Sequence, residues 1–148
     1  MSGQKSVFSL LCAGGLLLAG GCGGEATLEP PTIHYGQAVC DLCGMIVSDE
    51  RFAAAEVVIR DGRAETRFFD DTGEIFELEV PEGVEFAWYV HDMRTLEWIE
   101  AGEAVFLRSE ELRTPMGLGI AAFASRTAAE SAQTDFGGEL YNLGDLRE

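Results

Sequence analysis

The dipeptide Asp61-Gly62 constrains the fold of this chain more than any other feature, because it lies between two segments of strand-like composition. Residues 51–60 end in a run of β-branched side chains, and residues 64–69 place apolar and polar side chains on alternate faces of an extended chain. An Asp-Gly pair between such segments is typical of a two-residue hairpin turn. We therefore predict an antiparallel hairpin here.

A short helix is predicted directly after this hairpin, over residues 72–78. Asp70 or Asp71 is placed to cap its N-terminus, because a carboxylate there accepts hydrogen bonds from the first free N–H groups. The run Pro81-Glu82-Gly83 ends the helix and starts a turn.

The second half of the chain has a similar order of elements. The pattern predicts strands over 84–91, 95–99 and 104–107, a long Ala-rich helix over 120–133, and a short strand at 140–141. The order strand–strand–helix therefore occurs twice, which predicts an α+β fold with two halves, about 34–83 and 84–148.

Residues 1–21 have the features of an export signal. Lys5 is the only lysine of the chain, residues 7–19 are apolar and small, and the run ends in Ala19-Gly20-Gly21-Cys22. The apolar run is too short to cross a membrane. It resembles a bacterial lipoprotein signal, which implies cleavage before Cys22 and lipidation of that cysteine. An ordinary secretory signal is the alternative.

Residues 22–33 are rich in Gly and Pro and are predicted to form a flexible tether. Residues 34–148 then form the folded domain. We expect an exported protein that faces the periplasm or the cell surface and touches the membrane only through its lipid.

The charge balance excludes one class of partner. The chain has 26 Asp and Glu against 10 Lys and Arg, which gives a formal net charge of −16. Proteins that bind nucleic-acid phosphates need a basic surface, so no nucleic-acid partner is expected.

Cysteine spacing narrows the chemistry. Cys12 leaves with the signal and Cys22 is consumed by the lipid, so Cys40 and Cys43 remain, in a C-x-x-C pair. In an oxidising compartment such a pair forms a disulfide by default. It also suits a thiol redox pair, half of a zinc site, or a site for a soft metal ion.

Methionines favour the soft-metal interpretation. Met45 lies two residues after Cys43 and can share its face in an extended segment, and Met116 lies between Pro115 and Gly117 in a predicted loop. One thiolate and neutral thioethers suit monovalent copper, Cu(I), better than Zn(II), which prefers more thiolate or imidazole ligands. His34 and His91 are the only histidines, and both are expected more often at the surface or in hydrogen bonds than as ligands.

A family resemblance becomes specific at this point. Its motifs are Cys43-Gly44-Met45, Phe69-Asp70-Asp71, Trp98, and the run Thr-Pro-Met-Gly-Leu-Gly-Ile-Ala-Ala-Phe over 114–123. Behind a lipoprotein signal, these resemble the NosL family, the copper chaperone lipoproteins of nitrous oxide reductase assembly. The match runs from about Tyr35 to Phe136.

The resemblance implies further expectations. The fold would be a pair of ββαβ-type units, distantly similar to organomercurial lyase. Cu(I) would be bound by Cys43, Met45 and Met116, with Cys40, His34 or His91 as further candidates. The recipient would be the copper–sulfide centre of the nitrous oxide reductase apo-protein, and the chain itself would not be an enzyme.

Alternatives from other classes stay open. Cys40 and Cys43 could serve a thiol–disulfide oxidoreductase, although the chain lacks the βαβ context of thioredoxins. They could also form a structural disulfide in a non-catalytic lipoprotein. An activity like that of organomercurial lyase would need more thiol ligands than the mature chain offers, and a shared fold does not give a shared function.

Overall fold

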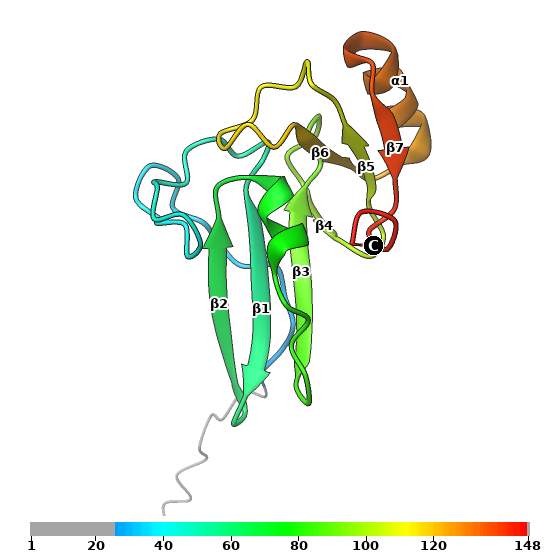
Figure 1. Ribbon diagram of the computed structural model, residues 1–148. Helices are drawn as coiled ribbons and strands as arrows, with labels where there is room; N and C mark the ends of the chain where they lie inside the picture. Colours follow the sequence, from blue (N-terminus) through cyan, green and yellow to red (C-terminus); the bar gives the residue numbers. More distant parts are fainter. Residues whose placement is uncertain (1–25, 148) are drawn as a thin grey trace, which may run out of the picture.

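The computed structural model describes residues 26–147, which fold into two antiparallel sheets (Figure 1). The first sheet has the order β2-β1-β3-β4, and its strands are β1 (Ala54–Arg60), β2 (Arg63–Phe69), β3 (Glu85–His91) and β4 (Trp98–Glu100). The second has the order β6-β5-β7, with β5 (Val105–Arg108), β6 (Ile120–Phe123) and β7 (Glu139–Tyr141). The predicted α+β class is confirmed.

The same series of elements occurs twice along the chain, once for each sheet. Two antiparallel strands are followed by a helix and then by a third strand that pairs with the first, as β1-β2-η1-β3 and β5-β6-α1-β7. The helices are η1 (Thr72–Glu77), a 3₁₀ helix, and α1 (Arg126–Phe136). Because β3 pairs with β1, the first sheet extends past the expected boundary between residues 83 and 84.

The predicted hairpin and its turn at Asp61-Gly62 are confirmed. Strand β1 pairs with β2 so that Arg60 lies opposite Arg63, with Asp61 and Gly62 between them. Both turn residues have positive φ angles, 50° and 72°, which a two-residue turn of this type requires. Local sequence alone was enough to predict this element.

The predicted helix over 120–133 is wrong in its first turn. Residues 120–123 form the fully buried strand β6, which pairs with β5, and the helix starts only at Arg126. Ser125 is the N-cap, because its hydroxyl accepts a hydrogen bond from the Ala128 N–H. Burial against a partner strand outweighs the helical preference of the two alanines in this segment.

The predicted strand over 95–99 lies later, at residues 98–100. Asp92 explains the shift, because its carboxylate accepts hydrogen bonds from the N–H groups of Arg94 and Thr95 at 2.8 and 2.9 Å. A turn held in this way cannot pair as a strand, and Leu96 within it has a φ of 63°.

Helix η1 lies between the two sheets and contacts β1, β2 and β6. Its residue Ile75 belongs to the main core cluster, together with Phe69 of the first sheet and Phe106 of the second. The helix therefore joins the two sheets through apolar contacts. Segments that are bound to the helix are held in a defined position relative to both sheets.

Residues 26–33 of the expected tether lie against the first sheet. The Tyr89 hydroxyl donates a hydrogen bond to the Leu28 carbonyl at 2.8 Å, and Ile33 is buried in the main core. The signal, Cys22 and residues 23–25 lie outside the described residues. Within the described part of the chain, no helix is long and apolar enough to cross a membrane.

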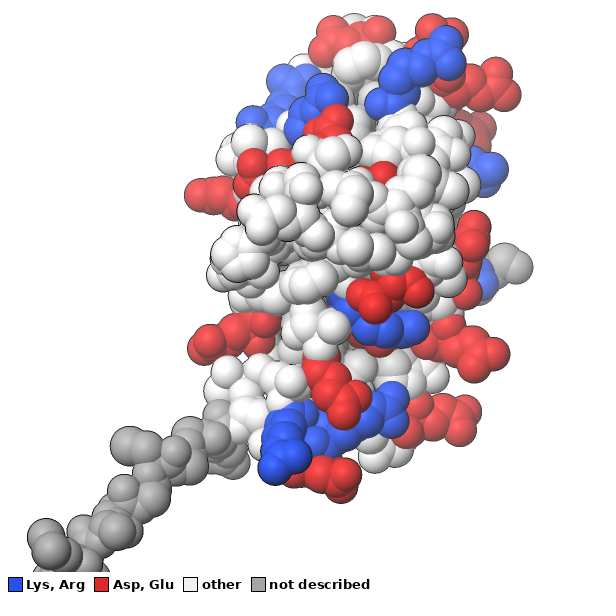
Figure 2. Space-filling view, turned by 90° about the vertical axis from the view of Figure 1, so that its left-hand side faces the viewer, with Lys and Arg blue, Asp and Glu red and all other residues white. Residues whose placement is uncertain are grey.

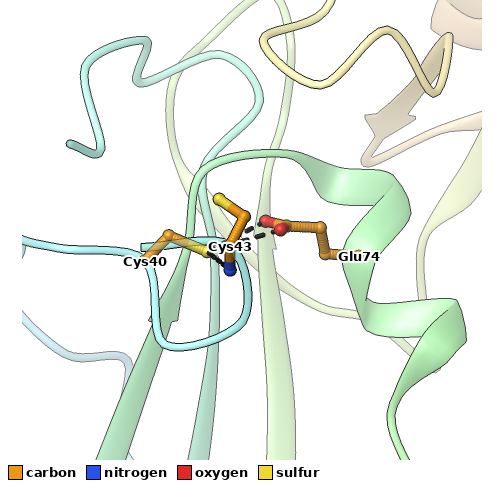
Figure 3. Close-up of side chains that lie close together, drawn as sticks. All are labelled: Cys40, Cys43 and Glu74. Atoms are coloured by element: carbon orange, nitrogen blue, oxygen red, sulfur yellow. Dashed lines mark hydrogen bonds between the residues drawn. The ribbon is translucent and has the colours of Figure 1, made fainter. Parts of the chain in front are cut away.

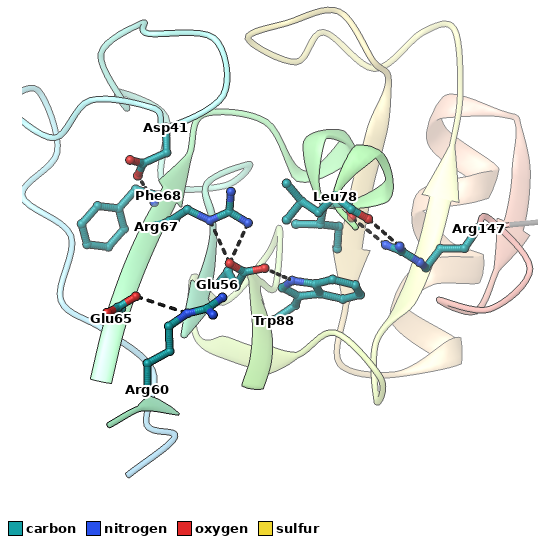
Figure 4. Close-up of polar contacts among 10 residues, drawn as sticks. Asp41, Glu56, Arg60, Glu65, Arg67, Phe68, Leu78, Trp88 and Arg147 are labelled. Carbon is teal, nitrogen blue, oxygen red and sulfur yellow. Dashed lines mark hydrogen bonds and ion pairs between the residues drawn. The ribbon is translucent and has the colours of Figure 1, made fainter. Parts of the chain in front are cut away.

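Two polar contacts tie this core together (Figure 4). The buried carboxylate of Glu56 accepts hydrogen bonds from Trp88 Nε1 at 3.0 Å and from Arg67 Nε at 2.8 Å. Near the C-terminus, the Arg147 guanidinium donates to the carbonyls of Ile75 and Leu78 at 2.9 and 2.6 Å. It thereby gives the Leu78 carbonyl a charged donor and adds a second donor to the Ile75 carbonyl, which also accepts the Leu78 N–H at 3.4 Å.

Replacing Arg147 by alanine is expected to lower the free energy of unfolding by about 1–3 kcal/mol, because it leaves two partly buried carbonyls without their charged donor. Urea denaturation of the full-length protein measures the change. Arg113→Ala, which removes an exposed arginine, is the control and should change stability by about 0.5 kcal/mol or less. Equal stability of the two variants would contradict the role of Arg147.

Candidate metal centre

Cys40 and Met45 pair across a small hairpin that packs beside β2. The Cys40 N–H donates to the Met45 carbonyl at 2.8 Å, and Gly44 turns the chain with a φ of 77°, a conformation that favours glycine. The hairpin is fixed to the sheet at Asp41, which exchanges two hydrogen bonds with the backbone of Phe68, at 2.8 and 2.7 Å. Tight backbone pairing therefore positions both cysteines.

The sulfur of Cys40 points inward, and only 2% of the residue is exposed. It accepts hydrogen bonds from the N–H groups of Leu42 and Cys43 at 3.4 and 3.3 Å. Its thiol lies 3.4 and 3.3 Å from the two carboxylate oxygens of Glu74 in η1. These contacts link the hairpin to the helix.

Cys40, Cys43 and Glu74 form a cluster with one potential ligand atom each, and these three atoms lie within 4.8 Å of one another (Figure 3). Both cysteines are free thiols. The pKa of Cys43 is raised to about 11, chiefly by burial and also by the neighbouring Cys40 thiol and Glu74 carboxylate, while a hydrogen bond from the Met45 backbone lowers it. Without a bound cation, Cys43 is therefore protonated at neutral pH.

Glu74 was missed in the sequence. It is the third residue of η1 and completes a capping box with Asp71, since its carboxylate accepts the N–H groups of Asp70 and Asp71 at 2.9 and 3.1 Å. The spacing Asp-x-x-Glu before an apolar residue could have indicated this box. It could not have indicated the contact with Cys40, which lies 34 residues earlier.

The Met116 loop is attached to the same turn of η1. The Met116 N–H donates to a carboxylate oxygen of Asp71 at 2.9 Å, while the other oxygen accepts the N–H of Gly73 at 3.0 Å. Leu118 packs so closely on Gly73 that an added Cβ would lie 2.6 Å from the Leu118 Cβ. Glycine at this position therefore allows the loop to approach the helix.

We call residues 71–74 the capping turn, because both sulfur-bearing loops are attached to it. The cysteine hairpin is held by Glu74 and the methionine loop by Asp71. The two thioethers themselves face outward, with Met45 42% and Met116 41% exposed. The capping turn thus brings two loops separated by about 70 residues of sequence to one helix terminus.

The histidines differ sharply. His91 is buried, its Nε2 lies 2.7 Å from the Tyr35 hydroxyl, its Nδ1 lies 2.8 Å from the Leu96 carbonyl, and its ring stacks on Trp98. Both of its nitrogens already have partners. His34 is exposed. Neither belongs to the cluster of Cys40, Cys43 and Glu74.

The surface around the cysteine hairpin is largely apolar, although the protein as a whole is strongly acidic. Exposed large hydrophobic side chains on the hairpin and the methionine loop are Val39, Leu42, Met45, Ile46 and Met116. Figure 2 faces the side of the molecule on which the cyan hairpin of Figure 1 lies, and its middle is a broad uncharged area with charged side chains above and below. An exposed apolar area of this kind is typical of a surface that contacts another molecule.

Comparison with known proteins gives a consistent result. The NosL family model matches residues 31–148. The copper-binding lipoprotein NosL of Stutzerimonas stutzeri is 27% identical over 159 residues, which cover 97% of this chain and 80% of the relative. The crystal structure of the copper chaperone NosL from Shewanella denitrificans aligns with a TM-score of 0.66 and 25% identity, over 80% of this chain and 96% of that one. Both relatives are named for copper binding or delivery and not for catalysis.

Replacing His91 by glutamine is expected to reduce the loss of stability on acidification. Burial lowers the pKa of His91 below its ordinary value of 6.5, more than the Leu96 hydrogen bond raises it. Below about pH 6.5 the unfolded chain therefore binds more protons at this residue than the folded chain does. The free energy of unfolding consequently decreases as the pH is lowered.

Urea denaturation between about pH 7.5 and 5 measures this slope. The slope should be shallower in His91→Gln than in the wild-type protein, and the exposed His34→Gln serves as the matched control. A His91→Gln slope as steep as that of the wild type would contradict the assignment.

Alkylation of Cys43 in the metal-free protein is expected to accelerate by about tenfold per pH unit without reaching a plateau near pH 9, because its pKa is raised to about 11. The rate of alkylation by iodoacetamide is measured by digesting the protein at successive times and analysing the peptides by tandem mass spectrometry. The fragment ions distinguish alkylation at Cys43 from alkylation at Cys40. Buried Cys40 should react more slowly at every pH. A plateau near pH 8.5 would contradict the raised pKa.

Proposed function

Because this chain belongs to the NosL family, we propose that it is a copper chaperone that holds one Cu(I) ion and passes it to an acceptor protein. The ligands are the Cys43 thiolate and the thioethers of Met45 and Met116. The acceptor is the nitrous oxide reductase apo-protein, whose copper–sulfide centre receives the ion. The protein is exported and is held at the membrane by a lipid on Cys22.

One observation carries this proposal: the capping turn holds both sulfur-bearing loops. Asp71 binds the Met116 backbone and Glu74 contacts the Cys40 thiol, so the two loops meet at one end of η1. A site whose ligands come from distant segments needs such a common support, because each loop alone would lose much conformational freedom on binding.

The donor chemistry supports a monovalent soft ion. Thiolate and thioether sulfur favour Cu(I), and a single thiolate balances its single charge. When the ion binds, the thiol of Cys43 releases its proton to solvent, and the positive charge of the ion offsets the cost of forming a thiolate where burial raises the pKa.

Release of the ion is supported by exposure. Met45 and Met116 are both about two-fifths exposed, so sulfur or imidazole groups of an acceptor can approach and replace the thioethers one at a time. The apolar side chains around them, including Val39 and Ile46, give such an acceptor a surface to contact.

The anchor is supported by the signal in residues 1–21 and by the name of the relative from Stutzerimonas stutzeri, a lipoprotein. The finer prediction for the fold, a distant similarity to organomercurial lyase, remains a prediction.

The alternative, a thiol–disulfide oxidoreductase, has one supporting feature, the free pair Cys40 and Cys43. Cys40 is buried, which leaves Cys43 as the thiol that could attack a substrate, and the pKa of Cys43 argues against that role. A nucleophilic cysteine in such enzymes has a lowered pKa, because the thiolate is the reactive form, whereas here the pKa is raised.

Titration of the protein with Cu(I) against a competing chelator tests the proposal. The full-length chain carries Cys12→Ser and Cys22→Ser, so that Cys40 and Cys43 provide its only thiols. One equivalent should bind tightly, Cys43→Ser should weaken binding by at least about 100-fold, and Met116→Leu or Met45→Leu by about tenfold each.

Met93→Leu is the matched control, because Met93 packs in the second core cluster and should leave Cu(I) affinity unchanged. The proposal fails if Cys43→Ser binds Cu(I) as tightly as the parent chain. It also fails if Met116→Leu is indistinguishable from Met93→Leu.

A further inference from the structure

The segment between Cys22 and the first sheet is short, and most of it is fixed to the fold. Residues 26–33, which we call the N-terminal strap, lie on the face of the first sheet opposite η1, in blue in Figure 1. We propose that the strap directs the Asp61-Gly62 end of the first sheet toward a phospholipid membrane and the metal centre away from it. This inference rests on the proposed lipid at Cys22.

Apolar contacts and one hydrogen bond hold the strap in place. Leu28 packs on a cluster of buried side chains from β1 and β3, namely Ala55, Val57, Ala87 and Tyr89. The Tyr89 hydroxyl also donates a hydrogen bond to the Leu28 carbonyl at 2.8 Å. Ile33, at the other end of the strap, is buried in the main core. The strap is therefore attached to the sheet at two points, five residues apart in the sequence.

The sequence of the strap keeps it extended between these points. Pro30 and Pro31 fix their own φ angles, and each keeps the preceding residue out of the helical region. Before them, Leu28 is half-buried while Thr27 and Glu29 are exposed, which is the alternation of an extended chain with one side on the sheet. An extended, proline-stiffened segment has a defined direction.

The two ends of the first sheet differ in what they carry. At one end Ala54 pairs with Phe69, and the neighbouring Phe68 is bound to the cysteine hairpin through Asp41. At the other end lies the turn between β1 and β2. The seven residues of β1, at a rise of about 3.4 Å each, separate these ends by about 20 Å. Figure 1 shows the strap leading from the hairpin end toward the turn end.

Chain length limits how far the protein can move from its anchor. Four peptide steps join Cys22 to Ala26, and these span at most about 14 Å when fully extended. A lipid on Cys22 therefore keeps the turn end close to the headgroups. The metal centre lies about 20 Å farther from the membrane, so an acceptor reaches the exposed Met45 and Met116 from the aqueous side.

Charge plays a smaller part in this orientation. Arg60 and Arg63 lie opposite each other beside the turn, are exposed, and suit phosphate headgroups. Asp61 and Glu85 lie at the same end, and Glu65 pairs with Arg60 at 3.4 Å, so the attraction is local. The net charge of the whole chain is −16. The tether and the strap, rather than electrostatic attraction, therefore set the orientation.

Fluorescence quenching on vesicles tests the orientation. The full-length lipidated protein carries a fluorophore on a single p-acetylphenylalanine, which leaves the native cysteines unlabelled. It is bound to phosphatidylcholine and phosphatidylglycerol vesicles that contain a headgroup-spin-labelled lipid as the quencher. A label in place of exposed Glu85 should be quenched at least about threefold more than one in place of exposed Val39, because the two ends lie about 20 Å apart.

A longer tether is the second variant. An insertion of about 20 Gly and Ser residues between Gly24 and Glu25 adds a flexible segment with an end-to-end distance of about 25 Å. It should remove the difference between the two labels, because the domain can then leave the membrane and rotate. The same insertion placed after Glu148 is the matched control and should preserve the difference. The urea midpoint of each labelled chain verifies that it folds.

The outcomes separate the orientation from the proposed function. Equal quenching of the two labels in vesicle-bound protein, or stronger quenching at Val39, overturns the orientation. A difference that survives the insertion at Gly24 overturns the role of tether length. A chain that lacks a lipid on Cys22 by mass spectrometry and does not float with vesicles overturns the anchor and the orientation together. Expected quenching with failed Cu(I) binding overturns the copper chaperone and leaves the orientation standing.

Discussion

The capping box of a six-residue 3₁₀ helix is the interaction on which the rest of the site depends. Asp71 and Glu74 satisfy the free N–H groups at the start of η1, as such boxes do in many helices. Here each carboxylate has a second partner as well, the Met116 N–H for Asp71 and the Cys40 thiol for Glu74. A local arrangement that caps the start of a helix therefore also holds two distant loops in place.

This arrangement has a buried side, with Cys40 and Glu74, and an exposed side, with Met45 and Met116. Cys40 and Glu74 are buried and held by backbone N–H groups, which makes that side rigid. The backbones of Met45 and Met116 are held by hydrogen bonds, but their side chains are exposed. In the proposed chaperone, the rigid buried side would hold the Cys43 hairpin in place, while the exposed thioethers would allow the ion to be exchanged.

Each carboxylate that this acidic chain buries needs hydrogen-bond donors, because a buried charge without them is destabilising. Glu56, Asp70, Asp71, Glu74 and Asp92 are all buried, and each accepts hydrogen bonds from N–H groups. Within residues 26–147, no buried side-chain nitrogen or oxygen lacks a partner. Burial still raises the pKa of Asp70, and the carboxylates of Glu74 and Asp71 nearby act in the same direction. Some of the many acidic side chains therefore stabilise the interior through hydrogen bonds, while the others lie on the solvated surface.

The sequence by itself determined the features whose cause is local. Asp61-Gly62 specifies its turn through backbone angles, and Asp70-Asp71 indicates a helix start, of which the structure selects Asp71 as the cap. The C-x-x-C pair with Met45 and Met116 predicts a site for a soft metal ion. Tertiary structure alone decided that residues 120–123 are a strand, because their burial and pairing with β5 outweigh helix propensity. It also decided that Glu74 joins the cysteines, since a contact across 34 residues leaves no local pattern in the chain.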